Sequence, residues 1–88
     1  MENKSKSFVA DDGTKSWYQN GLLHRTDGPA VEYPNGHKEW YQNGLLHRTD
    51  GPATECADGT KYWYLKGEIL TESQLNSPSF MEFIKLVN

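Results

Sequence analysis

Hydrophobic and polar residues alternate in short runs over most of this chain, and a glycine-containing dipeptide follows each run. Strand-like segments cover residues 14–19, 37–42 and 60–65, and each contains a Trp-Tyr pair. Asn-Gly follows the first two segments at 20–21 and 43–44, and Lys-Gly follows the third at 66–67. Asn-Gly between two such runs is a strong signal for a β-hairpin with a two-residue turn. The pattern therefore predicts short antiparallel strands joined by tight turns.

The strands belong to a repeat of 23 residues. Residues 17–30 and 40–53 have the same sequence, WYQNGLLHRTDGPA, and a third, divergent copy begins at Trp63. A second turn dipeptide recurs at the same spacing, as Asp12-Gly13, Asn35-Gly36 and Asp58-Gly59. Repetition at this period is typical of stacked supersecondary units. We therefore predict a mainly β fold, a twisted antiparallel meander of roughly six strands in one sheet.

The chain divides into three parts. Residues 1–7 are polar and predict a disordered tail, residues 8–70 hold the repeats, and residues 71–88 differ in character. Thr71 to Gln74 matches a capping box, and Pro78 to Val87 has hydrophobic residues at helical spacing. We expect this helix to cover the end of the sheet; the alternative is a helix that docks on a partner.

Composition excludes several classes of function. The 88 residues carry 9 Lys+Arg against 12 Asp+Glu, a net charge of -3, which argues against a nucleic-acid polymer as the main partner. Cys56 is the single cysteine, so no intramolecular disulfide forms. No hydrophobic run is long enough for a membrane span, and the N-terminus has no signal-peptide core. These features predict a cytoplasmic protein.

The period and the order Trp, Asn-Gly, His-Arg, Asp-Gly and then Tyr33-Pro34-Asn35-Gly36 resemble the MORN repeat, a β-hairpin unit of this length. The variant H-R-x-D-G-P-A is more similar to divergent MORN-type repeats of small bacteriophage proteins. The resemblance covers residues 8–70 and departs from the standard pattern after the histidine. It implies a hairpin-repeat fold and a function in protein binding, in dimerisation or at lipid membranes.

One polar cluster repeats with the hairpins: His24, Arg25 and Asp27, and again His47, Arg48 and Asp50. One interpretation is structural, with each aspartate paired to its arginine or to turn N–H groups and each histidine packed against a tryptophan. The other is a binding site, in which the arginines bind an anion and aromatic rings stack on a base. The aromatic candidates, either in the core as a stacked row or on the surface, are Trp17, Tyr18, Trp40, Tyr41, Trp63 and Tyr64.

The sequence favours a binding protein over an enzyme, because it has no phosphate loop and no nucleophile motif. Two histidines and two aspartates without a cysteine partner do not form a recognisable zinc pattern, so neither a metal nor a cofactor is predicted. The leading hypothesis is a phage protein that blocks or sequesters a host protein. The alternatives are a binder of an anionic nucleotide and a membrane-associated scaffold. We also expect a homodimer, since the strand at Phe8 has an unpaired edge without proline or charge.

Overall fold

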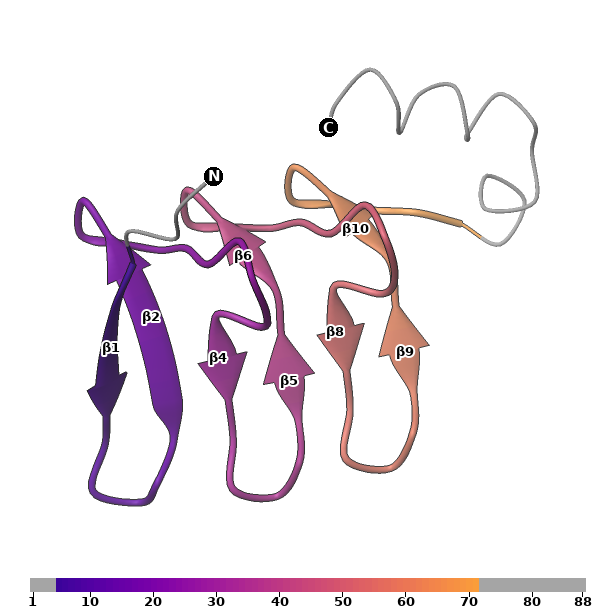
Figure 1. Ribbon diagram of the computed structural model, residues 1–88. Coiled ribbons are helices and arrows are strands. Elements are labelled where there is room, and N and C mark those ends of the chain that lie inside the picture. Colours follow the sequence, from indigo (N-terminus) through magenta and orange to yellow (C-terminus); the bar gives the residue numbers. More distant parts are fainter. Residues whose placement is uncertain (1–4, 72–88) are drawn as a thin grey trace.

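The computed structural model describes residues 5–71, which form antiparallel β-structure without a helix in that range (Figure 1). The strands are β1 (Lys6–Val9), β2 (Lys15–Gln19), β3 (Leu22–Leu23), β4 (Val31–Glu32), β5 (Lys38–Glu39), β6 (Tyr41–Gln42), β7 (Leu45–Leu46), β8 (Thr54–Glu55), β9 (Lys61–Tyr62), β10 (Tyr64–Leu65) and β11 (Glu68–Ile69). No helix within residues 5–71 is long and hydrophobic enough to span a membrane.

The strands form three sheets rather than the single sheet predicted. Seven belong to the main sheet, in which β1-β2-β4-β5-β8-β9 are hydrogen-bonded in that order and β3 pairs with β2. The other two sheets are the hairpins β6–β7 and β10–β11. The difference lies in the partner strand: β1 pairs with β2 from Lys15 to Tyr18, through Trp17, whereas its equivalent β4 pairs with β5 only at Lys38 and Glu39. Trp40 makes the same two backbone bonds as Trp17, from its own N–H to Ala53 O and from His47 N–H to its carbonyl, and so links the main sheet to the β6–β7 hairpin.

The two kinds of turn dipeptide have different geometry. At Asn20-Gly21 both residues have positive φ, 53° and 78°, as the two-residue hairpin turn requires, and Lys66-Gly67 keeps this conformation at 49° and 85°. At Asp12-Gly13 only the glycine has positive φ. The Asp12 carboxylate instead accepts the Thr14 N–H at 2.9 Å, which lowers its pKa. The glycine is thus needed in both turns, and the residue before it has two different roles.

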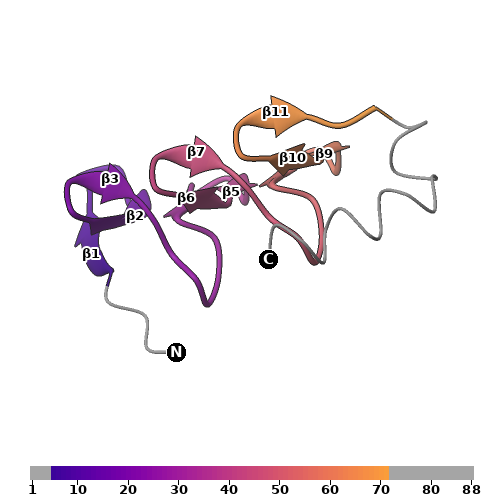
Figure 2. The same cartoon turned by 90° about the horizontal axis from the view of Figure 1, so that it is seen from above.

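Equivalent hydrogen bonds recur 23 residues apart and connect one hairpin to the next. Gly44 N–H donates to Leu23 O and Gly67 N–H to Leu46 O, both at 2.8 Å. In the view from above, the β2–β3, β6–β7 and β10–β11 hairpins follow one another in the same orientation (Figure 2). The hairpins are therefore joined through their backbones, and each is supported by its neighbour.

The buried hydrophobic core is small. Its members within residues 5–71 are Ala30, Val31, Ala53 and Leu65. The three tryptophans are half-buried, and they do not stack in the row that the sequence suggested: the aromatic ring pair found in this range joins Tyr33 and His37. Strand β1 begins at Lys6, inside the predicted disordered tail. The predicted C-terminal helix lies outside the described residues.

Candidate functional site

Each His-Arg-x-Asp segment is held by its own arginine. Arg25 Nε donates to Asp27 at 2.8 Å, while its Nη1 donates to Pro29 O at 3.0 Å and to Glu32 at 3.2 Å. The same three bonds recur at Arg48, at 2.9, 3.0 and 3.1 Å, with Asp50, Pro52 O and Glu55. The Arg–Asp pairing considered from the sequence is therefore present in both copies.

The arginines also stack on the tryptophans. The Arg25 guanidinium carbon lies 3.8 Å from the centre of the Trp17 ring, and that of Arg48 lies 3.9 Å from Trp40. Sequence reasoning placed histidine against these rings, which is wrong because the arginine occupies that position. The adjacent glycine leaves room for the stack: a Cβ at Gly51 would lie 2.8 Å from the Arg48 guanidinium carbon.

The two histidines instead join consecutive hairpins. His24 Nδ1 accepts the N–H of Asn43 at 3.0 Å, and His47 Nδ1 accepts the N–H of Lys66 at 2.9 Å. Both rings are buried, at 9% and 8% exposure. Burial lowers the pKa of His47, with a further contribution from the positive charge of Lys66. At Nδ1 each imidazole therefore serves as a hydrogen-bond acceptor for the next hairpin and has no donor there for an anion.

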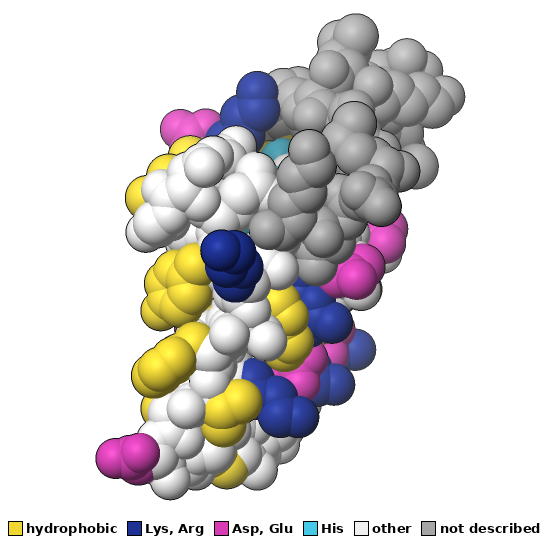
Figure 3. Space-filling view, turned by 60° about the vertical axis from the view of Figure 1, so that its left-hand side comes forward, with side chains coloured by type: hydrophobic (Ala, Val, Ile, Leu, Met, Phe, Trp, Pro, Cys, Tyr) yellow, Lys and Arg dark blue, Asp and Glu magenta, His cyan; other side chains and the backbone are white. Residues whose placement is uncertain are grey.

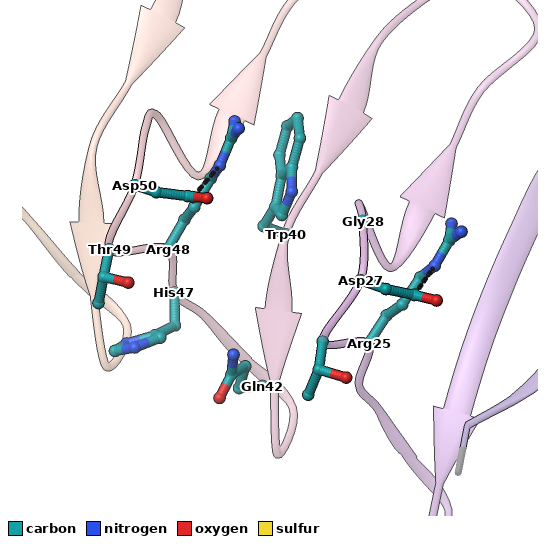
Figure 4. A pocket seen from close by; sticks show the side chains of 10 residues that line it. Arg25, Asp27, Gly28, Trp40, Gln42, His47, Arg48, Thr49 and Asp50 are labelled. Atoms are coloured by element: carbon teal, nitrogen blue, oxygen red, sulfur yellow. Dashed lines mark hydrogen bonds and ion pairs between the residues drawn. The ribbon is translucent and has the colours of Figure 1, made fainter. Parts of the chain in front are cut away.

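A groove runs between the two His-Arg-x-Asp segments, with Trp40 standing between them (Figure 4). Its volume is about 500 Å³, and its lining residues are Arg25, Thr26, Asp27, Gly28, Trp40, Gln42, His47, Arg48, Thr49 and Asp50. Most of the predicted polar cluster thus meets in one place; His24 and Trp17 do not line the groove. A second hollow, of about 310 Å³, shares Gln42 and His47 with the groove and extends to Leu45.

The charges in the groove do not suit an anion. The Asp27 and Asp50 side chains are 61% and 84% exposed, whereas those of Arg25 and Arg48 are 19% and 21% exposed. A phosphate bound bidentately needs Nη2 together with Nε or Nη1. Both of those nitrogens already donate to protein acceptors in each arginine. The accessible charges of the groove are therefore carboxylates.

The remaining aromatic candidates differ in strand and in exposure. Tyr18 is 41% exposed in β2, Tyr41 is half-buried in β6, and Tyr64 is half-buried in β10. Trp63 is the third-repeat equivalent of Trp17 and Trp40. The position equivalent to Arg25 and Arg48 is Thr71 in that repeat, so Trp63 has no stacked arginine from its own repeat. Of the six aromatic candidates, Trp40 is the one that lines the groove.

Sequence reasoning missed a cluster centred on Glu39. Its carboxylate accepts from Tyr41 Oη at 3.2 Å and Tyr33 Oη at 3.5 Å, and lies 3.0 Å from His37 Nε2. Burial, followed by the negative charge of Glu39, raises the pKa of Tyr41 to about 12. Tyr33, His37 and Glu39 lie outside the identical blocks, so the repeat pattern gave no signal for the cluster, although Tyr41 belongs to the second block.

Within residues 5–71 no three His, Cys, Asp or Glu side chains are placed to hold a metal ion. Comparisons with protein-family models, with curated proteins and with solved structures found no match for this chain.

Proposed function

We propose that this chain is a non-catalytic binding protein that occupies a surface of a partner protein, with MORN-like hairpins over residues 8–70 as the scaffold that carries its contact surface. The observation that carries the proposal is the exposure of large hydrophobic side chains on a structure with little core. These are Phe8, Val9, Tyr18, Leu22, Tyr33, Leu45, Tyr62 and Ile69, each 38–59% exposed. Exposed hydrophobic side chains that gather on a surface mark protein-binding sites, and Figure 3 shows several along one side of the molecule.

The contact surface combines the groove with Leu22 of β3 and Leu45 of β7. Leu22 and Leu45 are 48% and 49% exposed. Leu45 lines the second hollow, which shares Gln42 and His47 with the groove. A contact surface with these two leucines and the carboxylates of Asp27 and Asp50 favours a partner whose surface offers hydrophobic groups and lysine or arginine.

Local rigidity supports this surface. The arginine bonds fix each His-Arg-x-Asp segment, and the Gly44 and His24 bonds fix each hairpin against the next. A surface ordered before binding loses less conformational entropy on association. Such a surface acts by blocking a partner, and it needs no reactive group.

The resemblance to repeats of small bacteriophage proteins makes a bacterial host factor the first partner to seek, and the bacterial cytoplasm the expected compartment. The experiment is a quantitative pull-down from bacterial lysate with the full chain. One variant carries Leu22→Ser with Leu45→Ser, and another carries Asp27→Asn with Asp50→Asn. The matched control is Phe8→Ser with Val9→Ser, which removes equally exposed hydrophobic side chains from β1.

We expect one stoichiometric partner that both contact-surface variants lose and the β1 control retains. Equal recovery by all four proteins, or recovery of no partner, would refute the proposal. Circular dichroism of each variant checks that the β-structure is intact.

Thermal shift of the wild type and of an Arg48→Met variant tests the nucleotide alternative. We expect no rise in melting temperature with a nucleotide panel, because the arginine donors are already engaged. A rise that Arg48→Met abolishes would instead make the groove a nucleotide site.

A further inference from the structure

The two ends of the main sheet are complementary halves of the repeat. Phe8 pairs with Ser16, Val31 with Glu39, and Thr54 with Tyr62, so β1, β4 and β8 have the same place in successive repeats. Strand β4 lies between β2 and β5, and β8 between β5 and β9. Within residues 5–71, β1 has β2 alone as a neighbour and β9 has β8 alone. Each end thus lacks the strand that the other end supplies.

We propose that copies of this chain associate head to tail, with β1 of one copy adding to the β9 edge of the next. The internal pairs fix the register. Ser16 faces Val31, and Glu39 faces Thr54. By the same 23-residue step, Tyr62 faces Phe8 of the second copy.

The neighbouring pair gives the second contact. Lys15 faces Glu32, and Lys38 faces Glu55, so Lys61 faces Val9 of the second copy. A backbone bond follows from the same equivalence. Trp17 N–H donates to Ala30 O, so the acceptor for Trp63 N–H is the Ser7 carbonyl of the second copy.

Equivalent side chains are more exposed at the two ends of the main sheet than in its middle. Val31 and Thr54, which have neighbouring strands on both sides, are 5% and 8% exposed. Phe8 has the same position with one neighbour and is 59% exposed, as is Val9, while Tyr62 at the other end is 43% exposed. Burial of such side chains is favourable in proportion to the hydrophobic area removed from water. At Phe8 and Val9, the two positions that form the proposed contact, strand β1 has neither proline nor charge to protect its edge; its charged residue, Lys6, stands at the other end of the strand.

The sequence after the third repeat departs from the repeat pattern at the positions equivalent to β8. The positions 23 residues after Thr54 and Glu55 hold Ser77 and Pro78, and proline has no N–H to donate to a ladder. A head-to-tail contact uses different surfaces on the two copies, so it gives an open chain or a closed ring rather than a two-fold dimer.

The test is the mass in solution of the full chain by light scattering over a range of micromolar concentrations. We expect the mass to rise with concentration above the 10.1 kDa of one chain. Val9→Lys places a lysine opposite Lys61 of the next copy and should weaken association at least tenfold. Val9→Glu recreates the Lys–Glu pair found at Glu32 and Glu55 and should strengthen it.

The decisive variant combines Val9→Lys with Lys61→Glu, which reverses the pair and should restore association. A wild-type mass of one chain at every concentration would overturn the proposal. A wild-type mass that stops rising at two chains, together with a double variant that does not associate, would also overturn it. That combination indicates a two-fold dimer in which β1 pairs with β1. Melting curves confirm that each variant is folded, and the Leu22→Ser, Leu45→Ser variant should associate as the wild type does. Loss of partner binding and loss of self-association are thus separate results.

Discussion

Replacement of Arg48 by methionine tests how the repeats are held, because it keeps most of the side-chain length and removes the guanidinium. The change removes a stack on Trp40, a bond to the Pro52 carbonyl and two ion pairs. The stack contributes about 0.5–1 kcal/mol at an exposed site, and the carbonyl bond about 1 kcal/mol. The Glu55 pair, whose carboxylate side chain is 33% exposed, adds about 0.5 kcal/mol, and the Asp50 pair, at 84% exposure, adds almost nothing.

The sum predicts that Arg48→Met lowers the free energy of unfolding by about 2 kcal/mol, a large share of the stability of a small domain. Asp50→Asn should change it by less than about 0.5 kcal/mol. Urea unfolding followed by tryptophan fluorescence measures both. Equal losses in the two variants, or no loss in Arg48→Met, would contradict this assignment of the energy.

Gly51 provides an independent check of the same packing. A Cβ at this position would meet the Arg48 guanidinium at 2.8 Å, and three hydrogen bonds keep that group from moving away. Gly51→Ala should therefore destabilise the wild type, yet cost little in the Arg48→Met background. A double-mutant cycle measures the difference in unfolding free energy. If the effects of the two substitutions simply add, the glycine is needed for the backbone conformation and not for the space it leaves to Arg48.

Three further predictions concern single positions. The pKa of His47 is lowered in the folded chain, so the unfolded chain binds more protons below about pH 6.5 and the free energy of unfolding falls on acidification. His47→Asn keeps a hydrogen-bond acceptor and should make that fall less steep in urea titrations at several pH values. An unchanged pH dependence would contradict this prediction. Lys66→Asn relieves a non-glycine residue at φ 49° and should raise the melting temperature, whereas an unchanged or lower value would show that the turn is not strained. Trp40→Ala should lower the free energy of unfolding by about 3 kcal/mol. An unchanged melting midpoint would show that the Trp40 ring does not contribute to stability.

The sequence was sufficient to predict the class of structure and the positions of its turns. Asn20-Gly21 specifies a turn that needs two positive φ values, and both are present. The mainly antiparallel β-structure follows from these turns and the alternating pattern. Sequence could not reveal the break at Trp40, because residues 38–42 alternate like residues 15–19 and only the partner strands differ.

The partners of the arginines were predictable in part. Arg48 with Asp50 lies within the repeated block and was considered as a pair, but Glu55 lies outside that block. A signal for it existed: Glu32 and Glu55 are also 23 residues apart. The choice of arginine rather than histidine for the tryptophan face was not predictable, since it depends on which of two adjacent side chains points back across the turn.

The divergent third repeat separates what the hairpin backbone needs from what joins one hairpin to another. Leu70 replaces the histidine of the earlier copies, yet its N–H still donates to Trp63 O at 2.8 Å, as His47 N–H donates to Trp40 O at 3.0 Å. The hairpin thus forms without the His-Arg pair. What the leucine cannot provide is an acceptor like His47 Nδ1, which holds the N–H of Lys66 in the following hairpin. The His-Arg-x-Asp segment therefore acts first as the connection to the next hairpin, and its conservation between the two copies follows from each having a hairpin to hold.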